Sequence, residues 1–300
     1  MTLHLLKDSQ DIYDEPSSFV RTFLLSDYCR SLSENTVELY SNALVKNFLP
    51  FCVSHNIIMT PAIVQASMPA YASYLERKAL SGATIQQYIN ILRIMMKAMG
   101  TPIIYAYRRS SEDRRAQKIK QMKRWFDEAD IAKCLAYDKP CIRDQLIIRL
   151  LAETGARVQE LSMVTWQDID LDANTIWLRY SKTQPRSNFF SDETKLLFYK
   201  LKGHSLFDSF DNRPLFPSVN RVKEIVADIL IELGLKTAKD GRGSHTFRHW
   251  VATYLYYVGN MQLTEIASLL GDRAQTINNT YLHPTAAMMK KRVVKAMGWE

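Results

Sequence analysis

The chain of 300 residues has few cysteines, the residues that stabilise many small secreted and zinc-binding domains. It contains four cysteines, and no two of them stand in a C-x-x-C spacing, so neither a disulfide framework nor a zinc site is expected. We expect these thiols to be reduced and buried: Cys29, Cys52, Cys134 and Cys141. Glycine and proline occur only ten times each, which argues against long disordered tracts.

The chain also lacks the apolar segments that membrane or exported proteins carry. It contains no run of 18 apolar residues, and its first residues show no charged segment followed by an apolar one. We therefore expect a cytoplasmic protein that does not enter the membrane.

Positive charge is the main feature of the composition. Lys and Arg number 39 against 31 Asp and Glu, which gives a formal net charge of +8 and a pI of about 9.2. Such an excess favours a polyanionic partner such as nucleic acid. Apolar residues make up 47% of the chain, enough for a normal core, and the length favours two domains.

The sequence predicts a mainly α fold with a small β-sheet (α+β), in two domains joined by a basic linker. Residues 1–107 look helical throughout, and residues 126–300 form the second domain. The linker, 108–125, contains eight Lys or Arg and two acidic residues. It is either a solvated charged segment or a strap that contacts DNA. The candidate DNA-binding residues in it are Arg108, Arg109, Arg114, Arg115, Lys118 and Lys120.

Helical spacing of apolar residues predicts three helices in the first domain, at 36–55, 64–80 and 82–99, with Ser33 and Ser81 as N-caps. In the second domain the pattern predicts a helix at 142–154 and two strands, at 175–180 and 187–190. From residue 192 onward it predicts further helices.

Polar residues stand in five stretches of the second domain where apolar residues would pack better. They are Arg157 with Glu160, Lys182 on the predicted hairpin turn, His245 with Arg248, Asp272 with Arg273, and Tyr281. Each stretch alone fits an ordinary structural role. Together they supply cations that can converge on one phosphodiester and a tyrosine that can attack it, since guanidinium groups bind phosphate oxygens in a bidentate manner.

Three short motifs, in this order, resemble those of the tyrosine recombinases, or phage integrase family. The chain has TGARVQEL at 154–161 and HTFRH at 245–249, where the family has T-G-x-R-x-x-E-L and H-x-L-R-H. It then has LLGD at 269–272 where the family has L-L-G-H, followed nine residues later by a tyrosine, as in the family. The resemblance covers roughly residues 126 to 290.

The resemblance implies a role for each residue. Tyr281 would attack the scissile phosphate to form a 3′-phosphotyrosyl link, while Arg157 and Arg248 hold the non-bridging oxygens. Lys182 would protonate the leaving 5′-oxygen, and His245 would assist proton transfer. Glu160 would orient the first arginine. Neither ATP nor a metal nor any other cofactor is implied.

Asp272 departs from the family pattern, which has His or sometimes Trp at this position. A carboxylate cannot donate a hydrogen bond to phosphate unless it is protonated. Three interpretations stay open: Asp272 orients Arg248 or the tyrosine, Arg273 or His283 supplies the missing donor, or the protein is slow or inactive.

The resemblance further implies a helical core-binding domain and a catalytic domain that clamp double-stranded DNA, with a homo-tetramer on DNA as the working state. The basic segment 288–299 resembles the helix that family members dock onto a neighbouring subunit, or it packs on its own domain. The leading hypothesis is a site-specific recombinase or integrase. The alternatives are a type IB topoisomerase and a DNA-binding relative with impaired catalysis.

Overall fold

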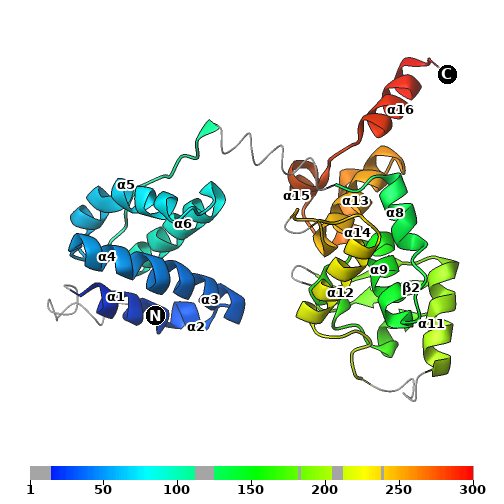
Figure 1. Ribbon diagram of the computed structural model, residues 1–300, viewed down its shortest axis with the longest axis horizontal. Coiled ribbons are helices and arrows are strands. Elements are labelled where there is room, and N and C mark those ends of the chain that lie inside the picture. Colours follow the sequence, from blue (N-terminus) through cyan, green and yellow to red (C-terminus); the bar gives the residue numbers. More distant parts are fainter. Residues whose placement is uncertain (1–14, 112–124, 182–183, 205–211, 238–239, 300) are drawn as a thin grey trace. The chain divides into compact units, whose positions relative to one another are not determined.

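The computed structural model describes residues 15–111, 125–181, 184–204, 212–237 and 240–299. The chain divides into two compact units, Met1–Gln117 and Lys118–Glu300 (Figure 1). Most described residues are helical, and the sheet they contain is small and antiparallel. The predicted mainly α fold with a small β-sheet is therefore confirmed.

The first unit is a helical bundle around its own core, with Phe48, Tyr71 and Leu92 among its fully buried members. Its described helical elements are α1 (Pro16–Leu24), α2 (Asp27–Arg30), α3 (Glu34–Ala43), η3 (Leu44–Phe48), α4 (Leu49–His55), α5 (Pro61–Arg77) and α6 (Gly82–Ala98). The predicted helix at 82–99 matches α6, and Ser81 caps it by accepting a hydrogen bond from the Thr84 amide.

The predicted helix at 36–55 corresponds to α3, η3 and α4, which follow one another without a break. Pro50 lacks an amide hydrogen and cannot donate to the carbonyl of Lys46, and the chain widens into a π-helical turn just before it. Lys78 donates to that carbonyl at 3.5 Å. A side chain thus takes the place of the missing backbone donor.

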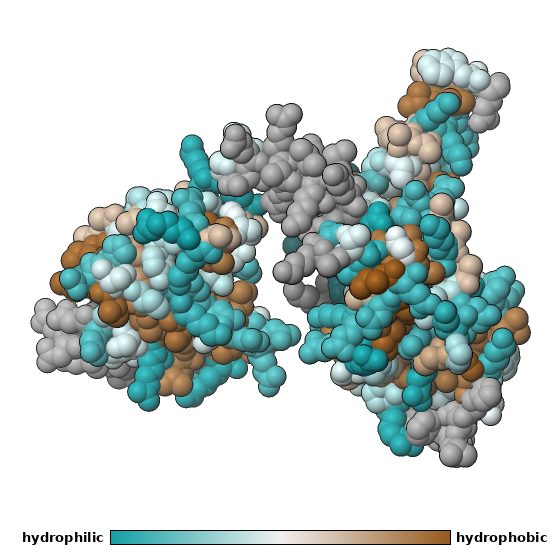
Figure 2. All heavy atoms as spheres, in the orientation of Figure 1, coloured by the Kyte–Doolittle hydropathy of each residue, from teal (hydrophilic) through white to brown (hydrophobic). Residues whose placement is uncertain are grey.

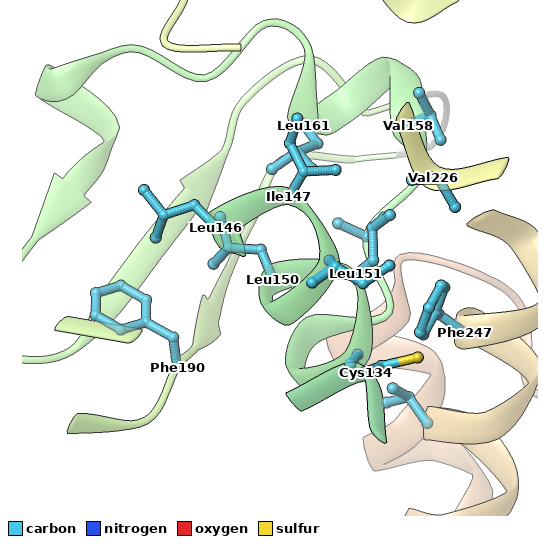
Figure 3. Close-up of a cluster of buried hydrophobic side chains, with 14 of the residues drawn as sticks. Cys134, Leu146, Ile147, Leu150, Leu151, Val158, Leu161, Phe190, Val226 and Phe247 are labelled. Atoms are coloured by element: carbon cyan, nitrogen blue, oxygen red, sulfur yellow. The ribbon is translucent and has the colours of Figure 1, made fainter. Parts of the chain in front are cut away.

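The second unit has a larger core, which surrounds α9. Its described elements are α8 (Glu128–Leu135), α9 (Ile142–Thr154), α10 (Val158–Leu161), η4 (Trp166–Asp168), β1 (Ile169–Asp170), β2 (Thr175–Leu178), β3 (Arg186–Phe189), α11 (Asp192–His204), α12 (Val219–Glu232), α13 (Ser244–Tyr257), α14 (Leu263–Leu270), α15 (Ala274–Thr276), η5 (Ile277–Tyr281) and α16 (Ala286–Met297). Figure 3 shows Leu146, Leu150 and Leu151 of α9 between Phe190 on one side and Phe247 of α13 on the other. The helix is buried over most of its length, so the elements packed on it are held in fixed positions.

The sheet of the second unit has the order β1-β2-β3, with both pairs antiparallel. The two predicted strands exist, but their bounds differ: β2 begins at Thr175 as predicted and ends at Leu178 instead of 180, and β3 spans Arg186–Phe189 instead of 187–190. The short strand β1 was not predicted, because two residues are too few for an alternating pattern.

The structure tests two expectations from composition, one about the cysteines and one about membrane-spanning helices. The four cysteines are free and three are buried, but Cys141 is exposed, so the prediction that all four are buried is wrong. Cys141 immediately precedes α9 as its N-cap, and a residue there lies at the surface end of an otherwise buried helix. None of the helices in the described part of the chain is long and apolar enough to span a membrane.

Candidate active site

The turn between α9 and α10 places Arg157 and Glu160 together. Gly155 ends α9 with φ +61°, and a Cβ at this position would lie 2.8 Å from a methyl group of Leu270, so the turn needs glycine. Arg157 is the N-cap of α10, and its backbone amide donates to Glu160 Oε2 at 2.8 Å. The same carboxylate also accepts from Arg157 Nη1 at 2.9 Å.

Glu160 is shared between two arginines and is almost completely buried, with 1% of its side chain exposed. Arg186 of β3 donates to it from Nη1 at 3.0 Å and from Nη2 at 2.8 Å. Burial alone would raise the pKa of Glu160, but the hydrogen bonds and charge of Arg186, then those of Arg157, lower this pKa to about 2. Glu160 is therefore an anion, and it neutralises only part of the positive charge beside it.

Arg186 was missed by the sequence reasoning. In β3 the side chains of Arg186 and Asn188 point inward and those of Ser187 and Phe189 point outward. An arginine at an inward strand position is the signal that could have found it, because a buried guanidinium must be paired.

The first turns of α13 present His245 and Arg248. Arg248 has no exposed side-chain surface and donates from Nη1 to the carbonyl of Gly155 at 3.0 Å. Its Nη2 donates to the carbonyl of Leu270 and to Asp272 Oδ2. Its buried Nε has no partner among the described residues.

The end of α14 collects all three arginines. Three successive backbone carbonyl groups each accept from a different guanidinium. Leu269 accepts from Arg186 Nε at 2.7 Å, Leu270 from Arg248 Nη2, and Gly271 from Arg157 Nη2 at 3.3 Å. The carbonyl groups at the end of a helix carry partial negative charge and lack helical partners, which makes this end a favourable place for cations.

Asp272 lies where the arginines and the tyrosine meet. Its Oδ2 atom accepts from Arg157 Nη2 at 2.7 Å, from Arg248 Nη2 at 2.6 Å and from the Tyr281 hydroxyl at 3.1 Å. Three residues separated by up to 124 positions in the sequence, Arg157, Arg248 and Tyr281, thus converge on one oxygen atom of Asp272. Of the alternative donors considered for this position, Arg273 is exposed and His283 binds the carbonyl of Thr280.

Tyr281 is buried and held by α13. The carbonyl of Tyr281 accepts from the hydroxyl of Thr253 at 3.0 Å, and that hydroxyl accepts from the amide of His283, also at 3.0 Å. The Arg248 guanidinium lies 5.3 Å from the centre of the tyrosine ring. These contacts fix the segment on both sides of the phenol.

Two histidine rings pack against the phenol ring, and a third histidine and a tryptophan pack behind them. The ring of His245, an exposed residue, lies 5.6 Å from that of Tyr281, and the buried ring of His249 lies 4.8 Å from it. His249 and His283 both pack against Trp125, at 4.1 and 4.0 Å. Neither Trp125 nor His249 was predicted as part of the site.

The pKa values of the three histidines near Tyr281, namely His245, His249 and His283, are all lowered. For His245 the loss of hydration comes first, followed by the charges of Arg248 and Arg157. Burial, helped by the neighbouring histidines, lowers the pKa of His249 to about 3. At neutral pH both side chains are therefore neutral.

The remaining predicted site residues lie outside the cluster. Lys182, Arg114, Arg115, Lys118 and Lys120 are outside the described residues. Arg108 is exposed and Arg109 is half-buried, both in the first unit. Over the ranges that the structure describes, no three His, Cys, Asp or Glu side chains are grouped in a way that could hold a metal ion.

Comparison with known proteins points in one direction. A sequence model described as the phage integrase family matches residues 121–288. Tyrosine recombinase XerA of Saccharolobus solfataricus is 29% identical over 300 residues, covering 97% of this chain and 94% of that protein. Tyrosine recombinase XerC of Staphylococcus epidermidis is 23% identical over 283 residues, covering 89% and 92%.

Solved structures show the same fold. The XerH site-specific recombinase bound to difH substrate in a pre-cleavage complex has a TM-score of 0.64 at 18% identity, covering 95% of this chain and 85% of that one. A lambda integrase dimer bound to a COC′ core site has a TM-score of 0.61 at 18% identity, covering 90% and 96%. The family match spans more than half of the sequence, and the three motifs meet in one cluster: the chain belongs to the phage integrase family, the tyrosine recombinases.

Proposed function

We propose that this protein is a site-specific DNA recombinase that cuts and rejoins DNA through a 3′-phosphotyrosyl intermediate at Tyr281. The observation that carries the proposal is the convergence on Asp272 Oδ2: two guanidinium N–H groups and the Tyr281 hydroxyl reach a single oxygen atom within 2.6 to 3.1 Å. Groups that can reach one oxygen of a carboxylate can also reach one oxygen of a phosphodiester.

In the proposed reaction the Tyr281 oxygen attacks the scissile phosphorus. The phenolic proton leaves, a bond forms between phosphorus and the tyrosine oxygen, and the bond from phosphorus to the 5′-oxygen breaks. The reverse attack by a 5′-hydroxyl restores the DNA, and because one ester replaces another, no energy source is needed. Arg157 and Arg248 stabilise the negative charge that grows on the non-bridging oxygens, where each such contact is worth roughly 10³-fold or more in rate.

The other roles are also proposals. Lys182 would donate a proton to the leaving 5′-oxygen. His245 is neutral at pH 7 because its pKa is lowered, and a neutral imidazole beside the tyrosine ring can accept a proton. Glu160 holds Arg157 in place, and because Glu160 also pairs with Arg186, it does not neutralise all of the charge of Arg157.

We further propose that the working state is a homo-tetramer on double-stranded DNA. The net charge of +8 favours phosphate contacts, and binding would then weaken steeply with salt. A related structure is a lambda integrase tetramer bound to a Holliday junction. In α16 of the present chain, Met289, Val293 and Met297 are exposed at intervals of four residues, and Figure 2 shows apolar atoms along this helix. That stripe is suited to contact a neighbouring subunit.

A trapping experiment tests the proposal. Fragments bound from random DNA would be selected, the cleavage position mapped, and a suicide substrate nicked near it incubated with the protein. We expect a covalent protein–DNA adduct from the wild-type chain and none from Tyr281→Phe, with DNA affinity within about threefold, since the hydroxyl is used in chemistry more than in binding. Tyr256→Phe is the matched control and should still form the adduct. An adduct formed by Tyr281→Phe would show that another residue is the nucleophile.

Asp272 supports a second candidate, a DNA-binding relative with impaired catalysis, because a carboxylate occupies the position at which the family has a donor. Failure of the wild-type chain to form an adduct, together with specific DNA binding, would favour that candidate. Relaxation of a plasmid that lacks the selected site would instead indicate type IB topoisomerase activity.

A further inference from the structure

Asp272 makes the contacts that a bound phosphate oxygen would make. Its Oδ2 atom accepts three hydrogen bonds, from Arg157, Arg248 and Tyr281, at 2.7, 2.6 and 3.1 Å. We infer that Asp272 is an internal counter-ion that occupies the phosphate-oxygen position in the DNA-free protein and is displaced when the scissile phosphate binds. The inference rests on the proposed function, because it takes the anion to be a DNA phosphate.

The hydrogen-bond pattern shows how displacement can occur without moving the arginines. Each Nη2 nitrogen of a guanidinium carries two hydrogens. Arg157 Nη2 donates one to the carbonyl of Gly271 and the other to Asp272, and Arg248 Nη2 divides its hydrogens between the carbonyl of Leu270 and Asp272. If the carboxylate leaves, both guanidiniums stay bound to the end of α14. One N–H of each then points at the same vacated position.

The balance of charge explains why an anion is present in the absence of DNA. Among the described side chains of the cluster, Arg157, Arg186 and Arg248 contribute three positive charges, and Glu160 and Asp272 contribute two negative charges. The net charge is +1 with Asp272 ionised and +2 without it. Since Arg248 has no exposed surface, uncompensated positive charge here would be costly.

A phosphodiester cannot share these donors with the carboxylate. Both would be anions within contact distance of each other, competing for the same two N–H groups and the same hydroxyl. The Asp272 side chain keeps 13% of its surface exposed, and we take the carboxylate to rotate toward this exposed side. The phosphate must therefore displace it, and its departure also releases the Tyr281 hydroxyl from its acceptor.

Thermal unfolding of the full chain with inorganic phosphate as probe tests this inference. Asp272→Asn keeps the shape and removes the charge. Without phosphate we expect its Tm to fall by about 5–10 °C, because a buried charge pair has lost one partner. With phosphate we expect apparent binding roughly tenfold tighter than for the wild type, because no internal anion competes.

Asp168→Asn is the matched control. Asp168 is also a buried aspartate bound to an arginine, since it accepts from Arg179 Nε at 2.6 Å, but among the described side chains a single guanidinium contacts it. This variant should lose stability and recover little with phosphate. If Asp272→Asn gains no more from phosphate than Asp168→Asn does, the inference is overturned. If Asp272→Asn is unfolded in low salt, phosphate should restore the fold, and failure to do so counts equally against it.

Covalent trapping separates this inference from the proposed function. We expect Asp272→Asn to form the DNA adduct at least as fast as the wild type, because the phosphate no longer has to displace a carboxylate. An adduct rate below about one-tenth of the wild-type rate would refute displacement, because a carboxylate that leaves when the phosphate binds cannot be required in the reaction that follows. Absence of any adduct from the wild-type chain would instead refute the proposed function, while the phosphate titration would still decide whether Asp272 occupies an oxyanion site.

Discussion

Replacing Arg186 with methionine is expected to lower the free energy of unfolding by about 3 kcal/mol at neutral pH, although Arg186 lies outside the sequence motifs. Methionine keeps much of the length of the side chain and removes the charge. The change leaves the Glu160 carboxylate, which is 1% exposed, with Arg157 as its remaining cation.

The magnitude follows from the pKa of Glu160. This pKa falls from 4.5 to about 2 in the folded protein, against the effect of burial and mainly through the hydrogen bonds and charge of Arg186. A shift of this size corresponds to about 3.4 kcal/mol of preference for the ionised carboxylate, at 1.36 kcal/mol for each pH unit. Removing one partner of a buried ion pair typically costs about 3–5 kcal/mol, which agrees with that value.

The pH dependence has a definite sign. The folded pKa of Glu160 is lowered, so its contribution to stability is complete above the unfolded value of 4.5 and is lost as the pH falls toward 2. The stability deficit of Arg186→Met should therefore be constant from pH 7 to about 5 and should narrow below that, where Glu160 becomes protonated in the unfolded chain.

Urea unfolding of Arg186→Met, Glu160→Gln and the double variant measures the pair directly. We expect a coupling energy of about 2–3 kcal/mol. The control is Arg221→Met, which breaks a pair with Glu224 whose side chains are 58% and 63% exposed and should cost less than about 0.5 kcal/mol. A coupling energy for Arg186 and Glu160 as small as that of the surface pair would refute the reasoning.

Three further predictions concern a buried histidine, a glycine at the end of α14 and the cysteines. His249 has a pKa of about 3 in the folded protein, so below pH 6.5 the unfolded chain binds a proton that the folded chain does not. Between pH 6.5 and 4.5 the free energy of unfolding of the wild type should therefore fall by about 2–3 kcal/mol more than that of His249→Phe. Urea unfolding at each pH measures this difference. Gly271→Ala should lower the free energy of unfolding by about 2 kcal/mol or more, because φ is +60° and the new Cβ would lie 2.6 Å from Arg186 Nη1. The control is Gly100→Ala, at φ +77° with no atom within 4 Å of the new Cβ, which should lower it by only about 1 kcal/mol. Iodoacetamide should label Cys141 in the native protein and spare Cys52 and Cys134, because burial raises the pKa of these two thiols to about 12. Mass spectrometry of tryptic peptides measures the labelling. Equal labelling of all three cysteines would contradict the burial of Cys52 and Cys134.

The predicted site residues that lie together through local geometry are those close in the sequence. Arg157 and Glu160 are three residues apart at the start of α10, where an N-cap residue and the third helical residue must meet. His245 and Arg248 are likewise within one turn of α13. Within such short motifs the helix itself sets the distance between the side chains, so their proximity does not depend on contacts with distant segments.

The part that the sequence did not predict depends on contacts between distant segments. Arg186 is 26 positions from Glu160 and 83 from Leu269, and both contacts exist only because β3 packs beside α10 and α14. Trp125 lies at the end of the segment assigned as a linker, yet it stacks against His283. The predicted strand began at residue 187, one position after Arg186, so the inward position of this arginine in β3 was not recognised.

The end of α14 also explains why the cluster is built from arginines. Arg157 and Arg248 each satisfy a backbone carbonyl and Asp272 from the same Nη2 nitrogen, and a carbonyl or carboxylate from Nη1. A planar guanidinium can do this because its donors point in several fixed directions at once, whereas the ammonium group of lysine is a compact point charge. The three donors of a lysine are all on one nitrogen, so a lysine at either position could not make the contacts that Nη1 and Nη2 make separately. The fixed contacts to α14 hold each guanidinium still, and the remaining N–H groups can then exchange an internal carboxylate for a phosphate without rebuilding the site.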